Sequence, residues 1–106
     1  MAIQVYKNQN EESVKIKVSG RFDFSEHKAF RDAYSKIDPT KTSITIDLTN
    51  TIYMDSAALG MLLVLRERAG GNHSDITLTG FNDSVGQILK ISRFENLFKL
   101  SDARVA

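Results

Sequence analysis

Ser56 is the residue with the clearest potential for chemistry, because it follows Asp55 at the point where a loop leads into an apolar segment. A serine at the beginning of a helix can cap the helix, and its hydroxyl can also accept a phosphoryl group. A phosphate there would meet free backbone N–H groups and the positive end of the helix dipole. Ser56 is therefore interpreted as a capping residue and as a candidate phosphorylation site.

Two aspartates accompany this serine. Asp55 is its neighbour in sequence, and Asp23 follows an earlier predicted strand. A phosphate on Ser56 would add about −1.5 to −2 charges beside Asp55. Each aspartate alone also suits the capping of a helix or turn, and this structural interpretation stays open for Asp23 and for Asp55.

Other chemistries have little support in the sequence. There is no cysteine, which excludes disulfides, thiolate metal sites and cysteine nucleophiles, and which fits a reducing compartment. His27 and His73 have no neighbours at metal-ligand spacing. There is no Gly-x-Ser-x-Gly motif, no phosphate-cradling glycine-rich loop and no general base near Ser56. We therefore expect no cofactor, no metal and no enzymatic activity.

Length and charge narrow the function classes further. The 106 residues suit one domain with one core, over residues 1–106, and the net charge is +1 from 14 basic and 13 acidic residues. This balance predicts no nucleic-acid partner and no acidic membrane surface. The longest apolar run, residues 61–65, is too short to span a bilayer, and the first residues do not resemble a signal peptide. We expect a cytoplasmic protein.

The hydrophobic pattern supplies the elements that must position Ser56. Alternation predicts strands near residues 3–6, 14–19, 44–49 and 76–79, and the polar residues 7–12 predict a hairpin between the first two. Helical spacing predicts three helices. The first runs from an N-cap at Ser25 to a stop at Asp38-Pro39. The second runs from Asp55-Ser56 to Gly70-Gly71, and the third begins at Asn82 or Asp83. Residues 94–100 are expected to close the core.

The order β-β-α-β-α-β-α predicts an α/β fold. Strands separated by helices pair in parallel through right-handed crossovers, and the polar alternate positions indicate helices mainly on one face. We expect a mixed, mostly parallel sheet of four to five strands. The loops at residues 21–25, 51–56 and 80–83 would then meet on one rim, where ligand and partner sites are favoured.

Several segments carry a resemblance to a known family. Residues 45–50 followed by 54–60, with Asp-Ser before small residues, Leu and Gly, resemble the phosphorylation motif of the STAS domains of sulfate transporters and anti-sigma factor antagonists. Residues 20–23 resemble the family's Gly-x-hydrophobic-Asp turn, and residues 76–80 and 94–100 also fit. Two positions differ: Ala57 is often Ser or Thr in the family, and Ala58 is usually Gly.

The resemblance to a single-domain antagonist implies the following function. The unphosphorylated protein binds an anti-sigma factor that has a serine kinase fold, and so frees a sigma factor or related regulator. The partner phosphorylates Ser56, which releases the complex, and a serine phosphatase resets it. The residues implied in partner binding are Asp23, Met54, Asp55, Ser56 and Ala57.

Two alternatives remain open from the sequence. A non-phosphorylated STAS subunit of an ABC lipid transporter would keep the fold without the phosphoswitch. A small enzyme with Ser56 as nucleophile would need a base that the sequence does not supply.

Overall fold

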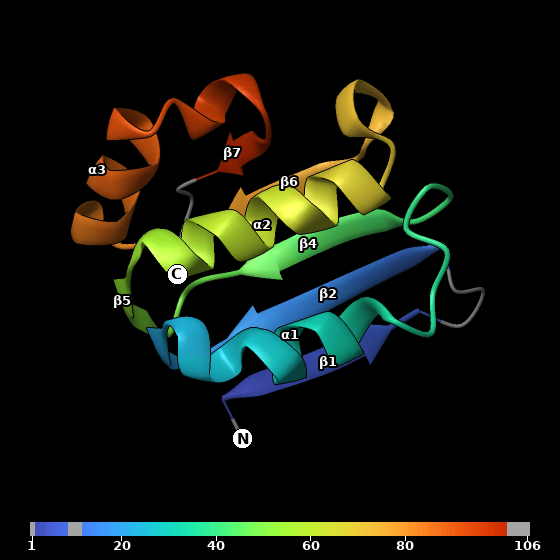
Figure 1. The fold of residues 1–106 in the computed structure, drawn as a ribbon, viewed down its shortest axis with the longest axis horizontal. Coiled ribbons are helices and arrows are strands. Elements are labelled where there is room, and N and C mark those ends of the chain that lie inside the picture. The colour runs from blue at the N-terminus through green and yellow to red at the C-terminus, as the bar shows by residue number, and fades with distance from the viewer. Residues whose placement is uncertain (1, 9–11, 102–106) are drawn as a thin grey trace.

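A five-stranded sheet forms the centre of the computed structural model, which describes residues 2–8 and 12–101 (Figure 1). The strand order is β1-β2-β4-β6-β7, with β1 antiparallel to β2 and the other pairs parallel. The five strands are β1 (Ile3–Lys7), β2 (Ser13–Val18), β4 (Ser43–Asp47), β6 (Ile76–Thr79) and β7 (Lys99–Ser101). The four predicted strands are confirmed, and β7 is an addition in the segment expected only to close the core.

A second, two-stranded sheet was not predicted. It pairs β3 (Gly20–Phe22) with β5 (Thr51–Met54) in parallel, directly beyond the ends of β2 and β4. The sequence pattern missed them because β3 has only three residues and β5 does not alternate, with two exposed residues between two buried ones. The predicted fold class, an α/β fold with a mostly parallel sheet, is nevertheless confirmed.

The helices α1 (His27–Tyr34) and α2 (Ser56–Arg68) cover the same face of the sheet and run side by side (Figure 1). The third helix, α3 (Asp83–Ile91), lies near the end of the sheet, close to β5. Short 3-10 turns complete the chain: η1 (Phe24–Glu26), η2 (Gly71–His73) and η3 (Phe94–Asn96). Among the described residues, no helix combines the length and the apolar character needed to cross a membrane.

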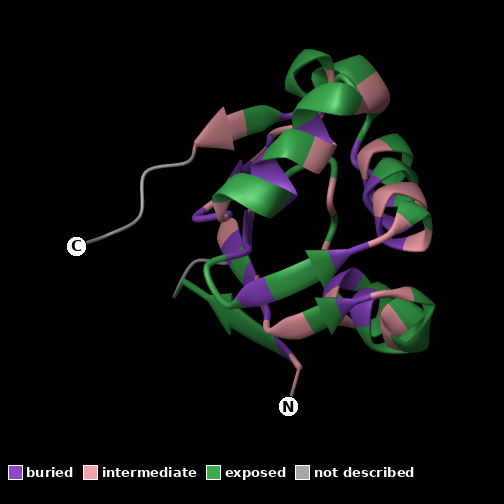
Figure 2. Ribbon diagram, turned by 90° about the vertical axis from the view of Figure 1, so that its left-hand side faces the viewer, coloured by how far each residue is buried: buried purple, intermediate pink, exposed green. Residues whose placement is uncertain are grey.

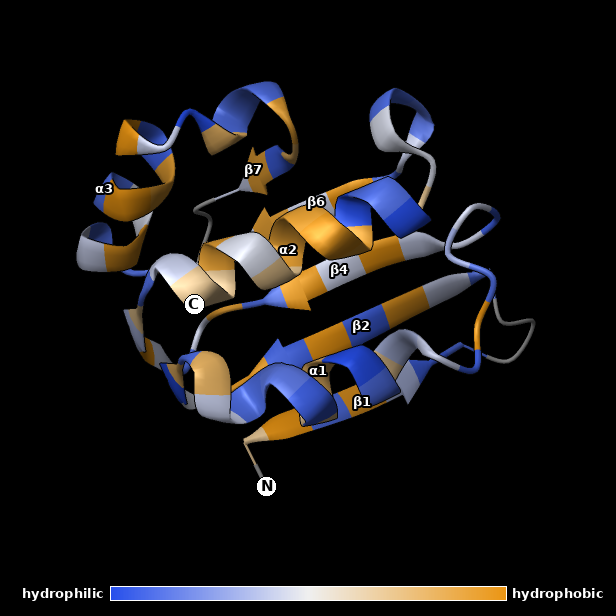
Figure 3. Ribbon diagram, viewed as in Figure 1, coloured by the Kyte–Doolittle hydropathy of each residue, from blue (hydrophilic) through white to orange (hydrophobic). Residues whose placement is uncertain are grey.

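The core lies between the sheet and its helices, where Figure 2 shows the buried residues gathering. Apolar and polar residues alternate along β2 and β4 (Figure 3), so that one side of each strand enters the core. Ile16, Ile46 and Leu78 are fully buried on three neighbouring strands, and Leu62 and Leu65 of α2 pack into the same core. Phe94 and Phe98 of the C-terminal segment are also buried and stack with ring centroids 5.3 Å apart, as expected for a closing element.

The first helix differs from the prediction. Ser25 does not cap it: Asp23 caps η1, and α1 begins only at His27, after Glu26. The helix ends at Tyr34, so Ile37 lies outside it. The beginnings of α2 and α3 agree with the prediction, and Gly70, with φ of 107°, ends α2 as expected. The predicted turn at residues 7–12 includes 9–11, which lie outside the described residues.

Candidate functional site

The beginning of α2 separates the roles of Asp55 and Ser56. Asp55 has an extended backbone, and its side chain accepts a hydrogen bond from the backbone N–H of Ala58 at 3.0 Å. Asp55 is therefore the N-cap, and Ser56 is the exposed first residue of the helix. The capping interpretation belongs to the aspartate, and the serine hydroxyl lies at the surface.

The small sheet brings Asp23 to the same rim. Phe22 of β3 is in register with Met54 of β5, so Asp23 and Asp55 leave neighbouring strand ends. The carboxylate of Asp23 accepts hydrogen bonds from the backbone N–H and the hydroxyl of Ser25, and it lies 3.6 Å from Nε of Arg21. The hydrogen bonds from Ser25 and the charge of Arg21 hold the pKa of Asp23 below its usual value. Asp23 is thus an ionised residue beside the start of α2.

The third loop joins this rim through Asn82. Its side chain caps α3 by accepting a bond from the N–H of Val85 at 2.8 Å, and its amide nitrogen lies 3.4 Å from the carbonyl oxygen of Thr51. Gly80 begins this loop with φ of 75°, and a Cβ there would collide with the side chain of Thr49. The close approach of the two loops therefore requires glycine. The three loops predicted to meet on one rim do so.

Exposed apolar side chains surround the serine, and the sequence prediction missed them. Phe24 is 69% exposed, and Ile52 is 68% exposed. The ring of Tyr53 carries the guanidinium of Arg21 at 4.1 Å from its centroid. Large apolar side chains in water next to a polar cluster are typical of binding surfaces. The signal in the sequence was an apolar pair, Ile52-Tyr53, in a segment otherwise interpreted as a loop.

Met54 corrects one expectation. It was expected to contact a partner, but it is 2% exposed and belongs to the core. In β5 the two middle residues, Ile52 and Tyr53, are exposed, whereas the two end residues, Thr51 and Met54, are buried. Ala57 is partly exposed next to Ser56, whereas Ala58 is buried. The accessible residues of the predicted set are Asp23, Asp55, Ser56 and Ala57.

The described residues contain no group of three or more His, Asp or Glu side chains that could hold a metal ion. His27 stacks on Phe24, with ring centroids 5.4 Å apart, and belongs to the aromatic surface beside the rim. At this rim an exposed serine hydroxyl at a helix start lies next to an ionised aspartate and exposed aromatic side chains.

Comparisons with known proteins agree with this fold. Residues 5–100 match the sequence model of a family described as "Mlab, STAS domain". A STAS-domain containing protein of Pseudomonas aeruginosa strain UCBPP-PA14 is 46% identical over 101 residues, which cover 95% of this chain and 100% of that protein.

Solved structures extend the likeness at the level of the fold. The anti-sigma factor antagonist SpoIIAA of Bacillus is similar in its unphosphorylated form, with a TM-score of 0.73 and 18% identity over 96% of this chain and 89% of that chain. Its phosphorylated form gives a TM-score of 0.70 and 17% identity, over 93% and 90% of the two chains. A sulfate transporter family protein from Wolinella succinogenes gives 0.74 and 16%, over 92% and 80%.

Proposed function

Since this chain belongs to the STAS domain family, we propose that it is a phosphorylation-controlled binding protein of the anti-sigma factor antagonist type. In this proposal the unphosphorylated protein sequesters an anti-sigma factor that has a serine kinase fold, and thereby relieves inhibition of a sigma factor or related regulator. Phosphorylation of Ser56 releases the partner, and a serine phosphatase restores binding. The protein acts in the cytoplasm as a binding protein rather than as an enzyme.

One observation carries this proposal: Ser56 is the exposed first residue of α2. It directly follows the N-cap Asp55 in the sequence, and Asp23 lies on the same rim. A kinase needs an accessible hydroxyl, and the phosphate needs a place that tolerates it in the folded protein. The N-terminus of α2 offers backbone N–H groups and a positive dipole end to the phosphate.

The same charge that the helix tolerates would oppose a docked partner. Two unit charges about 4 Å apart repel by ~1 kcal/mol in water and ~4 kcal/mol at an effective dielectric constant near 20. An interface over the rim removes water and lowers the local dielectric constant, so repulsion between the phosphate, Asp55, Asp23 and any partner acid grows on docking. The proposed release is therefore electrostatic and needs no change of fold.

A capture experiment tests the proposal. Ser56→Ala and Ser56→Asp baits are compared, with Ser84→Asp as matched control because Ser84 is also exposed in the first turn of a helix, α3. We expect the Ser56→Ala and Ser84→Asp proteins to retain one kinase-like partner that the Ser56→Asp protein loses. Equal recovery by all three would argue against control at Ser56.

The alternative, a non-phosphorylated STAS subunit of an ABC lipid transporter, is compatible with the same fold, because a sulfate transporter family protein shares this fold as well as the antagonists do. It predicts a different partner: an ATPase that copurifies with membrane subunits, recovered equally with either bait. Identification of the captured protein by mass spectrometry separates the two functions.

A further inference from the structure

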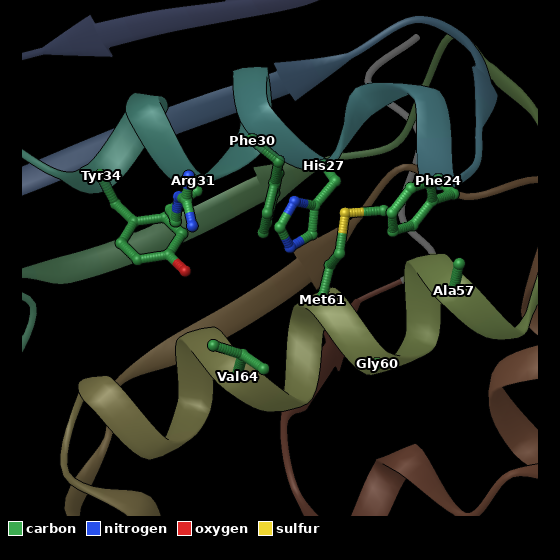
Figure 4. Close-up of a pocket in the computed structure, with 9 residues that line it drawn as sticks. All are labelled: Phe24, His27, Phe30, Arg31, Tyr34, Ala57, Gly60, Met61 and Val64. Carbon is green, nitrogen blue, oxygen red and sulfur yellow. The ribbon is translucent and has the colours of Figure 1, made fainter.

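An apolar groove runs between α1 and α2 and begins next to Ser56. Figure 4 shows its lining side chains pointing into the space between the two helices. Its volume is about 310 Å³, and its apolar lining comes from Phe24, Phe30, Ala57, Gly60, Met61 and Val64. Phe24 and Val64 are strongly exposed, at 69% and 48%, although both are apolar. Burying them would stabilise a complex by the hydrophobic effect.

The groove is continuous with the candidate phosphorylation site. Ala57, which lines one end of the groove, directly follows Ser56 in the first turn of α2. Phe24 and His27 stack on the opposite side of this end, directly after Asp23. A segment that fills the groove would therefore lie next to the first turn of α2, which begins at Ser56.

The other end of the groove is positively charged. Arg31 and Tyr34 line both the groove and an adjoining hollow, whose lining also includes Arg68 and Asp32. Asp32 is paired with Lys28 at 3.0 Å, so the two arginines give this end its net positive charge. Arg31 and Arg68 are exposed and take part in no ion pair within the described part of the chain. Burial raises the pKa of the Tyr34 hydroxyl, and the two arginines oppose this rise. Two guanidinium groups beside a protonated hydroxyl suit a carboxylate ligand.

We infer that the groove receives an amphipathic helix of the proposed anti-sigma factor partner. The apolar side chains of this helix lie in the groove, and an acidic residue lies against Arg31 and Arg68. The inference rests on the proposed function, because it assigns the partner segment that lies next to Ser56. Along α2 the groove extends from Ala57 to Val64, seven residues, or about 10 Å of helix. Apolar side chains at positions i, i+4 and i+7 of a bound helix span a similar length. The unpaired arginines set its orientation, with the acidic end away from Ser56.

Site-specific photocrosslinking identifies the occupant. A photoreactive phenylalanine analogue replaces Phe24 or Val64 in the Ser56→Ala protein, and Ile91 is the matched control position because it is 76% exposed on α3. We expect Phe24 and Val64, but not Ile91, to link to one apolar segment of the captured partner with acidic residues at one end. Crosslinks to a second copy of this chain, to a lipid or to a basic segment, and the absence of crosslinks, would each overturn the inference.

Affinity measurements separate this inference from the proposed function. They use the partner that crosslinking has identified, purified on its own and without a crosslink. We expect Val64→Glu, and Arg31→Glu combined with Arg68→Glu, to weaken binding at least about tenfold, as loss of a buried contact does at an interface. Ile91→Glu should leave the affinity unchanged, and Phe24→Ala provides a second groove variant. Unchanged affinity of the groove variants, with loss in Ser56→Asp, would overturn the groove and leave the phosphoswitch intact. Loss of affinity in the groove variants, with no effect of Ser56→Asp on affinity, would overturn the phosphoswitch and leave the groove inference intact.

Discussion

At the scale of single residues, Asp55 and Ser56 have similar capping ability but different roles. Asp55 supplies the hydrogen bond that begins α2, at 3.0 Å to the N–H of Ala58, and this leaves the Ser56 hydroxyl at the surface. The arrangement therefore allows modification of Ser56 without loss of the helix start.

Ser56→Ala should change stability little. We expect its free energy of unfolding to fall by no more than about 0.5 kcal/mol, as for ordinary surface substitutions. Asp55→Ala removes the cap and should cost about 0.5–2 kcal/mol. Urea denaturation of both variants checks this order, and a larger loss in Ser56→Ala would show that Ser56 has a structural role.

Ser56 should also be the main phosphorylated residue in cells, because it is exposed at a helix start in the STAS family motif. Intact-mass analysis and peptide mapping of the protein from cells test this. Phosphate found chiefly on Ser25, Ser43 or Ser84 would contradict the assignment.

Asp47 gives the molecule a defined acid sensitivity. Burial acts to raise its pKa, but hydrogen bonds from the hydroxyl and N–H of Thr49, with Lys15 and Lys17 nearby, bring the pKa below its ordinary value of 3.8. A carboxyl whose pKa is lower in the folded state contributes stability above its unfolded pKa, and this is lost as pH falls through the folded value. Thr49→Val should therefore reduce the loss of stability below about pH 4, measured by urea denaturation from pH 2 to pH 6. An unchanged pH profile would contradict this role of Thr49.

The residue patterns in the sequence predicted the site better than its surroundings. Asp55-Ser56 before an apolar run marked the start of α2 correctly, because capping chemistry is local. The exposed Tyr53 and the buried Met54 were not distinguished, since β5 has two exposed residues between two buried ones and so lacks the alternation of a strand. The groove arises from two helices packed together through the tertiary structure, and no local pattern in either helix specifies it.

At the scale of elements, the short β3–β5 sheet is what places Asp23 beside Asp55. Phe22 of β3 pairs with Met54 of β5, and Asp23 and Asp55 follow these two residues. Alternation predicted four strands of the main sheet, including the four-residue β6, whereas β3 is only three residues long and β5 does not alternate. The rim is therefore a tertiary feature attached to a locally encoded sheet.

Asp23→Ala should weaken partner binding or phosphorylation of Ser56 while the protein stays folded. Asp38 is a matched control, because its exposed carboxylate accepts the same pair of bonds, from the N–H and hydroxyl of Thr40. We expect Asp38→Ala to leave binding and phosphorylation unchanged. The affinity for the purified partner and the rate of phosphorylation are measured for both variants. Equal affinities and equal rates of the two variants would contradict a role for Asp23.

At the scale of the whole molecule, the buried core and the surface that carries Ser56 are separate. The core lies between the sheet and the helices, while Ser56, Phe24 and Ile52 lie outside it. We therefore expect a phosphate on the rim to change partner binding without disturbing the hydrophobic core. The phosphorylated and unmodified proteins should share one fold, with differences in backbone amide spectra confined to the rim.

The phosphoswitch is tested by calorimetric measurement of the affinity for the purified partner, with the phosphorylated and with the unmodified protein. Each 1.4 kcal/mol of repulsion weakens binding about tenfold, so one phosphate on Ser56 should reduce the affinity by about ten- to a thousandfold. Ser56→Ala should bind like the unmodified protein and resist inactivation by the kinase. Equal affinities of the phosphorylated and unmodified proteins would contradict the switch.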